Sequence, residues 1–155
     1  RAVAPTGRVF SFETRDDMLA VARRNLTRLR LTDYVTLKQH DIADGFGLTG
    51  VSALFLDVRE PWQYMRQVFD AMADDGRFGA LLPTTNQVSN LLAAMPEAHL
   101  DCVEVMEVLI REYKALPGRL RPDDQMVGHT GFLVFACKVN YSPTATQRNG
   151  DLPDS

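Results

Sequence analysis

The sequence has few cysteines and no long hydrophobic run. Cys102 and Cys137 stand alone, without CxxC or Cys/His spacing, so they predict neither a disulfide framework nor a zinc site. The longest apolar runs, at residues 51–56 and 132–137, are far shorter than the roughly 18 residues of a membrane-spanning helix. We therefore expect a cytoplasmic protein with reduced, buried thiols, no metal and no membrane span.

The first residues lack an initiator Met and the features of a signal peptide. Residues 1–7, Arg-Ala-Val-Ala-Pro-Thr-Gly, are short and weakly apolar, whereas a signal peptide needs a longer apolar core. We expect the chain to be part of a longer protein. Its 155 residues, 45% of them hydrophobic and 24% charged, are typical of one globular domain and exclude disordered and fibrous classes.

The net charge of -3 conceals an uneven distribution. Residues 1–40 hold 8 bases and 4 acids, residues 41–110 hold 3 bases and 11 acids, and residues 111–138 hold 5 bases and 3 acids. A fold that brings the two basic flanks to one face would bind a polyanion, because binding follows the local field. Ordinary solvated charge explains the same distribution equally well.

Strand and helix patterns alternate along the first two thirds of the chain. Period-two and apolar runs predict strands, and a 3.6-residue apolar stripe such as Leu19, Ala22 and Leu26 predicts helices. The expected strands are 8–13, 35–39, 51–56, 77–82, 102–113 and 132–138, with helices from Thr14, from Pro61 to about Met72, and from Thr84 or Thr85. The order predicts an α/β fold with a mostly parallel sheet.

The sequence also predicts where individual helices, strands and the domain end. Thr14 and Asp17 form a helix-capping pattern, residues 74–76 should end the second helix, and residues 51–56 should be buried on both faces. The two last strands have no helix between them, which predicts an antiparallel hairpin at the sheet edge, bulged near Glu104. Residues 139–155 are polar, so we expect a disordered tail after a domain at 1–138.

Acidic residues follow three successive predicted strands. Glu13, Asp41 and Asp57 each stand where a strand ends, and ligands of parallel α/β sheets bind beyond the carboxyl ends of the strands. A carboxylate at the end of the first strand can accept from both hydroxyls of a ribose, and Asp41 can accept from an adenine amino group. The three acids together predict a nucleotide site on one rim.

The segment Asp57-Val-Arg-Glu-Pro61-Trp62 is the most suggestive short motif. Pro61 restricts the turn, so the Asp57 carboxylate can project into a crevice as a base or acceptor for an amine. Alternatively Asp57 only caps the helix that begins at Pro61, with Trp62 as a core anchor. The motif alone favours neither interpretation.

Four segments together resemble a known family. They are Phe55-Leu-Asp57 with Pro61-Trp62, Pro83-Thr-Thr-Asn-Gln-Val88, Arg121-Pro122, and Met126-Val-Gly-His129-Thr130-Gly-Phe-Leu-Val134. They are similar to segments of the tRNA (adenine-58-N1)-methyltransferases, which are class I, S-adenosylmethionine-dependent enzymes. The resemblance runs from Arg1 to about Lys138. It implies a Rossmann-like methyltransferase sheet and methyl transfer to N1 of an unpaired adenine turned out of the tRNA.

The resemblance also assigns roles to single residues. Glu13 would hold the cofactor ribose, Asp41 the adenine amino group, and Asp57 would lie between methyl donor and target base; Met18 stands where relatives often have a polar residue that contacts the cofactor. His129 and Thr130 would line the same pocket or merely cap the last strand. Arginines near Pro117-Gly118 would contact tRNA phosphates or form a subunit interface, since relatives assemble as homotetramers: Arg111, Arg119 and Arg121.

The sequence departs from the family pattern in two places. Relatives usually read Asp-x-Pro-Asp-Pro-Trp, whereas Arg59 and Glu60 stand here, and Arg59 is placed to pair with Asp57. The glycine-rich cofactor loop and the strand before it are absent from this chain. That strand would lie between the strands at 8–13 and 51–56, so we expect this chain alone to bind cofactor poorly.

Two other classes of protein fit some of the same residues. An NAD-dependent oxidoreductase would also use Glu13 on a ribose. A non-catalytic tRNA-binding subunit would keep the fold without binding cofactor, although retention of Glu13, Asp41 and Asp57 together argues against it. Titration with S-adenosylmethionine and with NAD separates the three possibilities.

Overall fold

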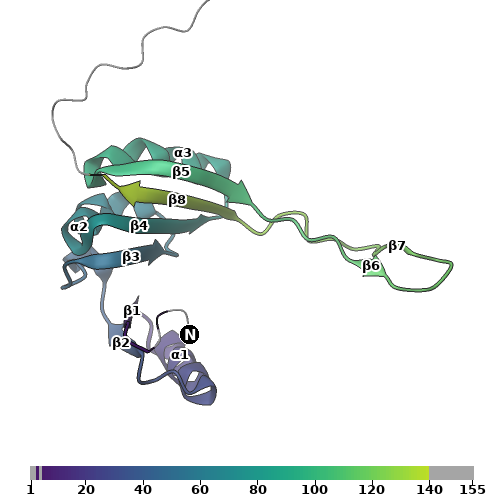
Figure 1. The fold of residues 1–155 in the computed structure, drawn as a ribbon, viewed down its shortest axis with the longest axis horizontal. Coiled ribbons are helices and arrows are strands. Elements are labelled where there is room, and N and C mark those ends of the chain that lie inside the picture. The colour runs from purple at the N-terminus through teal and green to yellow at the C-terminus, as the bar shows by residue number, and fades with distance from the viewer. Residues whose placement is uncertain (1–2, 4, 140–155) are drawn as a thin grey trace, which may run out of the picture. The chain divides into compact units, whose positions relative to one another are not determined.

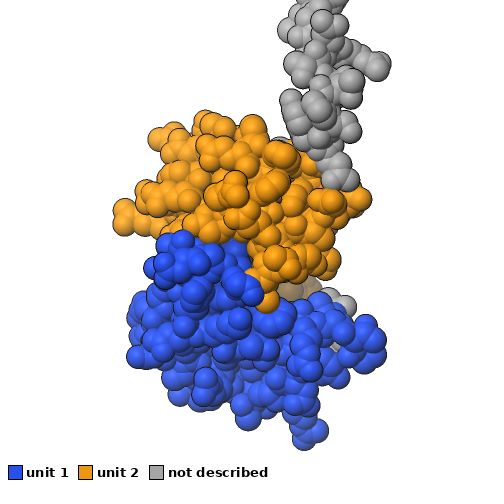
Figure 2. Space-filling model, turned by 90° about the vertical axis from the view of Figure 1, so that its left-hand side faces the viewer, with its two compact units in different colours: residues 1–47 blue, residues 48–155 orange. Residues whose placement is uncertain are grey.

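The computed structural model describes residue 3 and residues 5–139, and it divides into two compact units (Figures 1 and 2). Unit 1 comprises residues 1–47 and unit 2 residues 48–155. Among the residues described, no helix is both long and apolar enough to cross a membrane. The tail expected at 139–155 lies outside the described residues, apart from Val139.

Unit 1 is a parallel strand pair joined by one helix. Strand β1 (Val9–Glu13) pairs with β2 (Val35–Gln39) from Val9 opposite Val35 to Glu13 opposite Gln39. Helix α1 (Asp16–Leu29) connects them, and the 3₁₀ turn η1 (Ile42–Asp44) follows β2. The cap expected at Thr14 is wrong: the N-cap is Arg15, without a side-chain cap. Arg15 instead pairs with Asp17 at 2.6 Å.

Unit 2 contains a four-stranded sheet in the order β3-β4-β8-β5. β3 (Val51–Leu56) runs parallel to β4 (Met72–Leu82), and β8 (Phe132–Lys138) lies antiparallel between β4 and β5 (Leu100–Glu107). The expected hairpin of the two late strands is therefore present, with β5 at the edge. A register shift between Cys102 and Glu104 confirms the expected bulge.

Helices cover one face of this sheet, and side chains of the helices and strands together form the hydrophobic core of unit 2. The 3₁₀ turn η2 (Pro61–Tyr64) leads into α2 (Met65–Ala71), and α3 (Thr85–Ala94) continues into η3 (Met95–Ala98). Both helices lie behind the strands in Figure 1. The largest side chains that are fully buried include Phe78, Met65, Leu82, Leu91 and Met95. Of the two expected candidates, Thr84 and Thr85, it is Thr84 that caps α3, with its side chain accepting from the Gln87 N–H.

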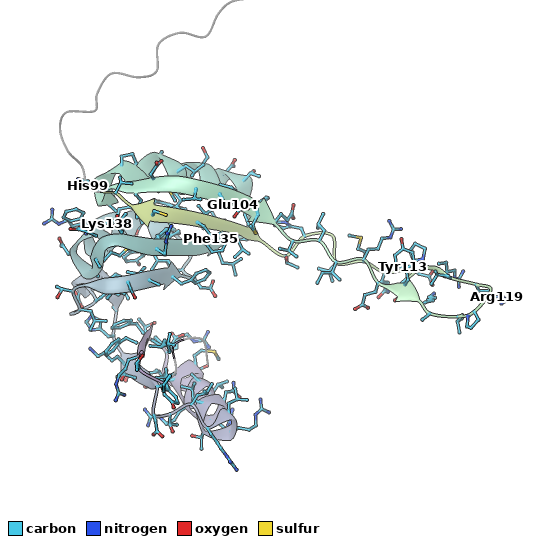
Figure 3. All side chains as sticks on the ribbon, viewed as in Figure 1. His99, Glu104, Tyr113, Arg119, Phe135 and Lys138 are labelled. Carbon is cyan, nitrogen blue, oxygen red and sulfur yellow. The ribbon has the colours of Figure 1, made fainter. Side chains whose placement is uncertain are left out.

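A buried lysine ties the sheet to the end of α2. Lys138 is 8% exposed, and its Nζ donates to the carbonyl oxygens of Phe69 at 2.9 Å and Met72 at 2.8 Å. These carbonyls lie at the C-terminal end of the helix, where unpartnered oxygens favour a cation. Lys138, labelled on β8 in Figure 3, thus has a structural role.

Three expected features of the strands are wrong. β3 is an edge strand whose Ser52, Ala53 and Phe55 are exposed, so it is not buried on both faces. β4 begins at Met72 and absorbs residues 74–76 as an irregular stretch, with Asp75 in the left-handed region at φ 60°. β5 ends at Glu107. Cys137 is half-buried rather than buried, with its Sγ in contact with the Arg77 guanidinium.

Residues 108–131, here called the arm, project from the end of the four-stranded sheet (Figure 1). Two short strands pair along it, β6 (Tyr113–Lys114) and β7 (Arg121–Pro122). Many of its apolar side chains are exposed: Val108, Leu109, Ile110, Tyr113, Leu116, Leu120, Met126 and Val127. Since soluble proteins seldom expose so many neighbouring apolar groups without a use, this segment is a candidate contact surface.

Candidate functional site

Glu13 and Asp41 lie at the same edge of the unit 1 strand pair. Glu13 is the last residue of β1, and Asp41 follows β2 by two residues. Glu13 Oε1 accepts from the Arg15 N–H at 2.9 Å, and Asp41 Oδ1 accepts from the Ala43 N–H at 2.9 Å. These bonds use one oxygen of each carboxylate. A carboxylate has about four acceptor positions, so both groups retain capacity for hydroxyl or amino donors.

The hollow described for unit 1 is not lined by these carboxylates. It is open, with a volume of about 720 Å³, and runs between α1 and β2. Its lining residues are Asp16, Leu19, Ala20, Arg23, Arg24, Thr27, Arg28, Leu37 and Gln39. Neither Glu13 nor Asp41 is among them, and Met18 is also outside it, with 39% of its surface exposed. The hollow therefore does not mark the nucleotide site expected from the sequence.

Asp57 is exposed at the carboxyl end of β3, in a loop whose two ends are anchored. Leu56 before it is 3% exposed, and Pro61 after the loop is fully buried. Among the described residues Asp57 has no hydrogen bond or ion pair. The pairing expected from Arg59 is therefore absent there. The capping role is also wrong, because the N-cap of η2 is Glu60.

The Asp57 loop is held by a residue that sequence reasoning missed. Gln87 Nε2 donates to the backbone carbonyl of Arg59 at 2.9 Å, while Gln87 Oε1 accepts from Thr84 Oγ1 at 2.8 Å. Thr84 and Gln87 have the spacing of a capping box, which was a readable signal. The Gln87 amide, however, meets the hydroxyl of the N-cap Thr84 with its oxygen and the loop with its nitrogen.

His129 has both ring nitrogens engaged within unit 2. Its Nδ1 contacts Glu107 Oε1, its Nε2 lies 2.6 Å from the Pro83 carbonyl oxygen, and its ring lies 5.0 Å from that of Phe132. The Glu107 carboxylate, and then the Pro83 carbonyl, raise the pKa of His129 above its usual 6.5. This geometry supports a structural tie at the base of the arm. Both His129 and Thr130 are exposed.

The three candidate arginines all lie on the arm. Arg111, Arg119 and Arg121 are exposed, and Arg119 lies at the far tip in Figure 3. Arg121 belongs to β7, opposite Lys114, whose Nζ pairs with Asp124. Among the described residues none of the three arginines has an ion pair. The arm thus presents unpaired guanidinium groups that suit phosphate contacts.

The structure divides the expected site residues between the two units. Glu13 and Asp41 share an edge in unit 1, while Asp57 and His129 belong to unit 2. The rim shared by all three acids stays a prediction, since they are divided between the units. Within the described part of the chain, no three His, Cys, Asp or Glu side chains are grouped to hold a metal ion.

Comparison with known proteins identifies the family. Residues 1–121 match the family described as "tRNA methyltransferase complex GCD14 subunit". A tRNA (adenine(58)-N(1))-methyltransferase TrmI of Thermus thermophilus is 34% identical over 136 residues, which are 86% of this chain and 53% of that protein. The chain spans about half the length of such curated relatives.

Solved structures agree with this match. The crystal structure of a protein named as a SAM-dependent O-methyltransferase, from Thermotoga maritima, has a TM-score of 0.83 and 44% identity, covering 88% of this chain and 52% of that chain. The tRNA (m1A58) methyltransferase TrmI of Aquifex aeolicus has a TM-score of 0.77 and 38% identity, covering 86% and 54%. Carboxylates after parallel strands, the loop before Pro61-Trp62 and these matches lead to one conclusion: the chain belongs to the tRNA (adenine-58-N1)-methyltransferase family and has its class I methyltransferase fold.

Proposed function

We propose that the full-length protein transfers a methyl group from S-adenosylmethionine to N1 of adenine 58 in tRNA. The observation that carries this proposal is Asp57, an exposed carboxylate without a protein partner among the described residues, at the end of a parallel strand in a chain of this family. Ligands of such sheets bind beyond that edge. The names of the relatives supply the acceptor base and its position.

The acids of unit 1 fit the adenosyl part of the cofactor. Glu13 and Asp41 each keep acceptor positions beyond their one backbone bond, and the hydroxyls of a ribose and the amino group of an adenine are donors. Glu13 would hold the ribose and Asp41 the adenine, and Met18, on the first turn of α1, would also contact the cofactor. When bound, S-adenosylmethionine supplies an activated methyl group.

Asp57 would orient the acceptor base. N1 lies on the pairing edge of adenine, so the nucleotide must be unpaired and turned out of the helix for its N1 to be reached. The Asp57 carboxylate accepts from the adenine amino group, directs N1 and stabilises the positive charge that develops on the ring. Orientation of this kind supplies much of the acceleration because no covalent intermediate is needed.

The arm would contact the RNA and other subunits. Arg111, Arg119 and Arg121 would pair with tRNA phosphates, and Thr130 would lie toward the acceptor pocket near His129.

The exposed apolar side chains of the arm support assembly into a homo-oligomer, which we propose is a tetramer. Light scattering of the full-length protein tests this, and a monomer at micromolar concentration contradicts it. We expect this activity in the cytoplasm.

The decisive experiment offers the full-length protein two tRNA transcripts, one with adenine and one with guanine at position 58. Nuclease digestion and mass spectrometry should find 1-methyladenosine only with the first transcript. Ribose-methylated nucleosides would contradict the proposal and favour transfer to oxygen, the chemistry for which the Thermotoga maritima protein is named.

Calorimetric titration separates the remaining alternatives. Heat with S-adenosylmethionine and none with NAD supports the proposal. Heat with NAD alone would indicate an oxidoreductase. Heat with neither ligand, together with binding of tRNA, would indicate a non-catalytic RNA-binding subunit.

A further inference from the structure

A continuous set of contacts in unit 2 connects the base of the arm to the Asp57 loop. It runs from Glu107 through His129 to Pro83, and from Thr84 through Gln87 to Arg59. The peptide bond between Pro83 and Thr84 joins the two parts. Glu107 ends β5, His129 lies in the arm before β8, Pro83 follows β4, Thr84 and Gln87 lie at the start of α3, and Arg59 lies in the loop after β3.

His129 fixes the point where the chain leaves β4. Neutral imidazole has only one N–H, whereas both of its nitrogens here face acceptors, the Glu107 carboxylate and the Pro83 carbonyl. A doubly protonated ring satisfies both. Among the described residues, Glu107 is the charged group in contact with His129. Because Pro83 directly precedes the N-cap Thr84, the contact also fixes the start of α3.

Gln87 connects the start of α3 to the Asp57 loop through two side-chain hydrogen bonds. The Arg59 carbonyl can only accept, so the Gln87 amide must turn its NH₂ toward it and its oxygen toward the Thr84 hydroxyl. Both ends of the Gln87 amide are therefore occupied. Gln87 is half-buried, which further limits its rotamers.

The direction of the Asp57 carboxylate depends on this loop. Asp57 has no partner of its own among the described residues, and the loop 57–60 is anchored by Leu56 and Pro61 at its ends and by Gln87 at Arg59. We propose that Gln87 and His129 are positioning residues for the methyl transfer, which together set the backbone that carries Asp57. This inference rests on the proposed function, in which Asp57 orients the base.

The test of Gln87 compares two neighbouring amide-to-acid changes in the full-length protein. Gln87→Glu places a carboxylate against the Arg59 carbonyl, while Asn86→Asp makes the same charge change on an exposed position of α3. Both acids suit the first turn of a helix, so α3 should remain stable. We expect Gln87→Glu to lower kcat by about 10-fold or more, since small misplacements are costly, with KM for S-adenosylmethionine unchanged. An unchanged kcat overturns the inference.

A double-mutant cycle tests whether His129 acts through the same path. His129→Phe keeps a ring beside Phe132 but removes both polar contacts. It should lower kcat by several-fold, and the double variant with Gln87→Glu should lose less than the product of the single effects. Effects that multiply would remove His129 from the path.

Hydrogen exchange distinguishes failure of this inference from failure of the proposed function. In Gln87→Glu the backbone amide of Gln63, which donates to the Glu60 carbonyl at the end of the loop at 3.1 Å, should exchange several-fold faster than in Asn86→Asp, whatever the acceptor is. Faster exchange without 1-methyladenosine in the unmodified protein would leave the loop contacts valid and overturn the function. Unchanged exchange overturns the inference even if tRNA is methylated.

Discussion

The two units differ in how much hydrophobic core supports their site residues. In unit 1 the buried apolar residues that the structure describes are Leu19 and Phe46, while Val9 and Phe10 of β1 are 39% exposed. In unit 2 both central strands and both helices contribute buried side chains. Burial of apolar surface is the main stabilising term in folding. The loop proposed to orient the acceptor base is therefore built on a well-packed scaffold, whereas the proposed cofactor acids are not.

The largest expected effect is on the core of unit 2. Phe78→Ala removes a ring that is 2% exposed and should destabilise unit 2 by about 3 to 5 kcal/mol. Val9→Ala, at a half-exposed edge position of unit 1, should cost less than about 0.5 kcal/mol. Urea unfolding of the 155-residue chain, followed by its single tryptophan, Trp62, for unit 2 and by hydrogen exchange of the α1 amides for unit 1, measures both. Equal effects would remove the contrast between the units.

Replacement of Asp57 should have the next largest effect. Asp57→Ala in the full-length protein should lower turnover on tRNA by roughly 10²-fold or more, in line with orienting and acid-base contributions. Glu60→Gln in the same loop is the matched control, because its amide still accepts from Gln63. Turnover as in the unmodified protein would exclude Asp57 from the reaction.

Replacement of Glu13 tests whether the acids of unit 1 bind the cofactor. Glu13→Ala should weaken binding of S-adenosylmethionine by about 1.5 to 3 kcal/mol, the range for hydrogen bonds to charged groups. Asp16→Ala, on the exposed first turn of α1, controls for loss of one negative charge. Calorimetry of the full-length protein measures both dissociation constants. If Glu13→Ala binds as tightly as the control, Glu13 is only structural.

The two basic flanks can be compared through the salt dependence of tRNA binding. Changing Arg111, Arg119 and Arg121 of the arm to Gln should reduce the slope of log affinity against log salt by about 1 for each phosphate that is no longer neutralised. The same change at Arg23, Arg24 and Arg28, which line the hollow of unit 1, should leave it unaltered. The reverse pattern would move the RNA-binding surface to α1.

The smallest expected effect concerns pH. The pKa of His129 is raised in the folded protein, so its contribution to stability is fully present below pH 6.5 and is lost as pH rises through the higher folded value. The thermal midpoint of unit 2 should therefore fall between pH 6 and pH 9 by more in the unmodified protein than in His129→Phe. Parallel curves would show that His129 contributes no pH dependence.

Local patterns in the sequence predicted much of the fold. The bounds of β2, β3 and β8 and the Thr84 cap are confirmed, because each depends on a short apolar run or on one side chain. The unpaired edge of β3 agrees with the expected absence of a strand between residues 8–13 and 51–56, but the apolar run could not show that Ser52, Ala53 and Phe55 would be exposed. Nor could the sequence show that Arg15 would pair with Asp17 and leave Thr14 outside the cap.

The candidate site was predicted only in part, for a similar reason. Acids that follow strands are visible in one dimension, and Glu13, Asp41 and Asp57 do stand at carboxyl ends of strands. The partners of His129 are 22 and 46 residues away in the chain, and Gln87 reaches Arg59 across 28 residues. Such contacts depend on the packing of several elements.

The insertion of β8 between β4 and β5 bears on the synthesis of the protein. Strands β4 and β5 emerge from the ribosome first, yet their shared neighbour is translated last among the described strands. Until residues 132–138 are released, both strands expose backbone groups that can pair with other chains. Nascent or prematurely terminated chains that end before Phe132 should therefore need chaperones to avoid aggregation.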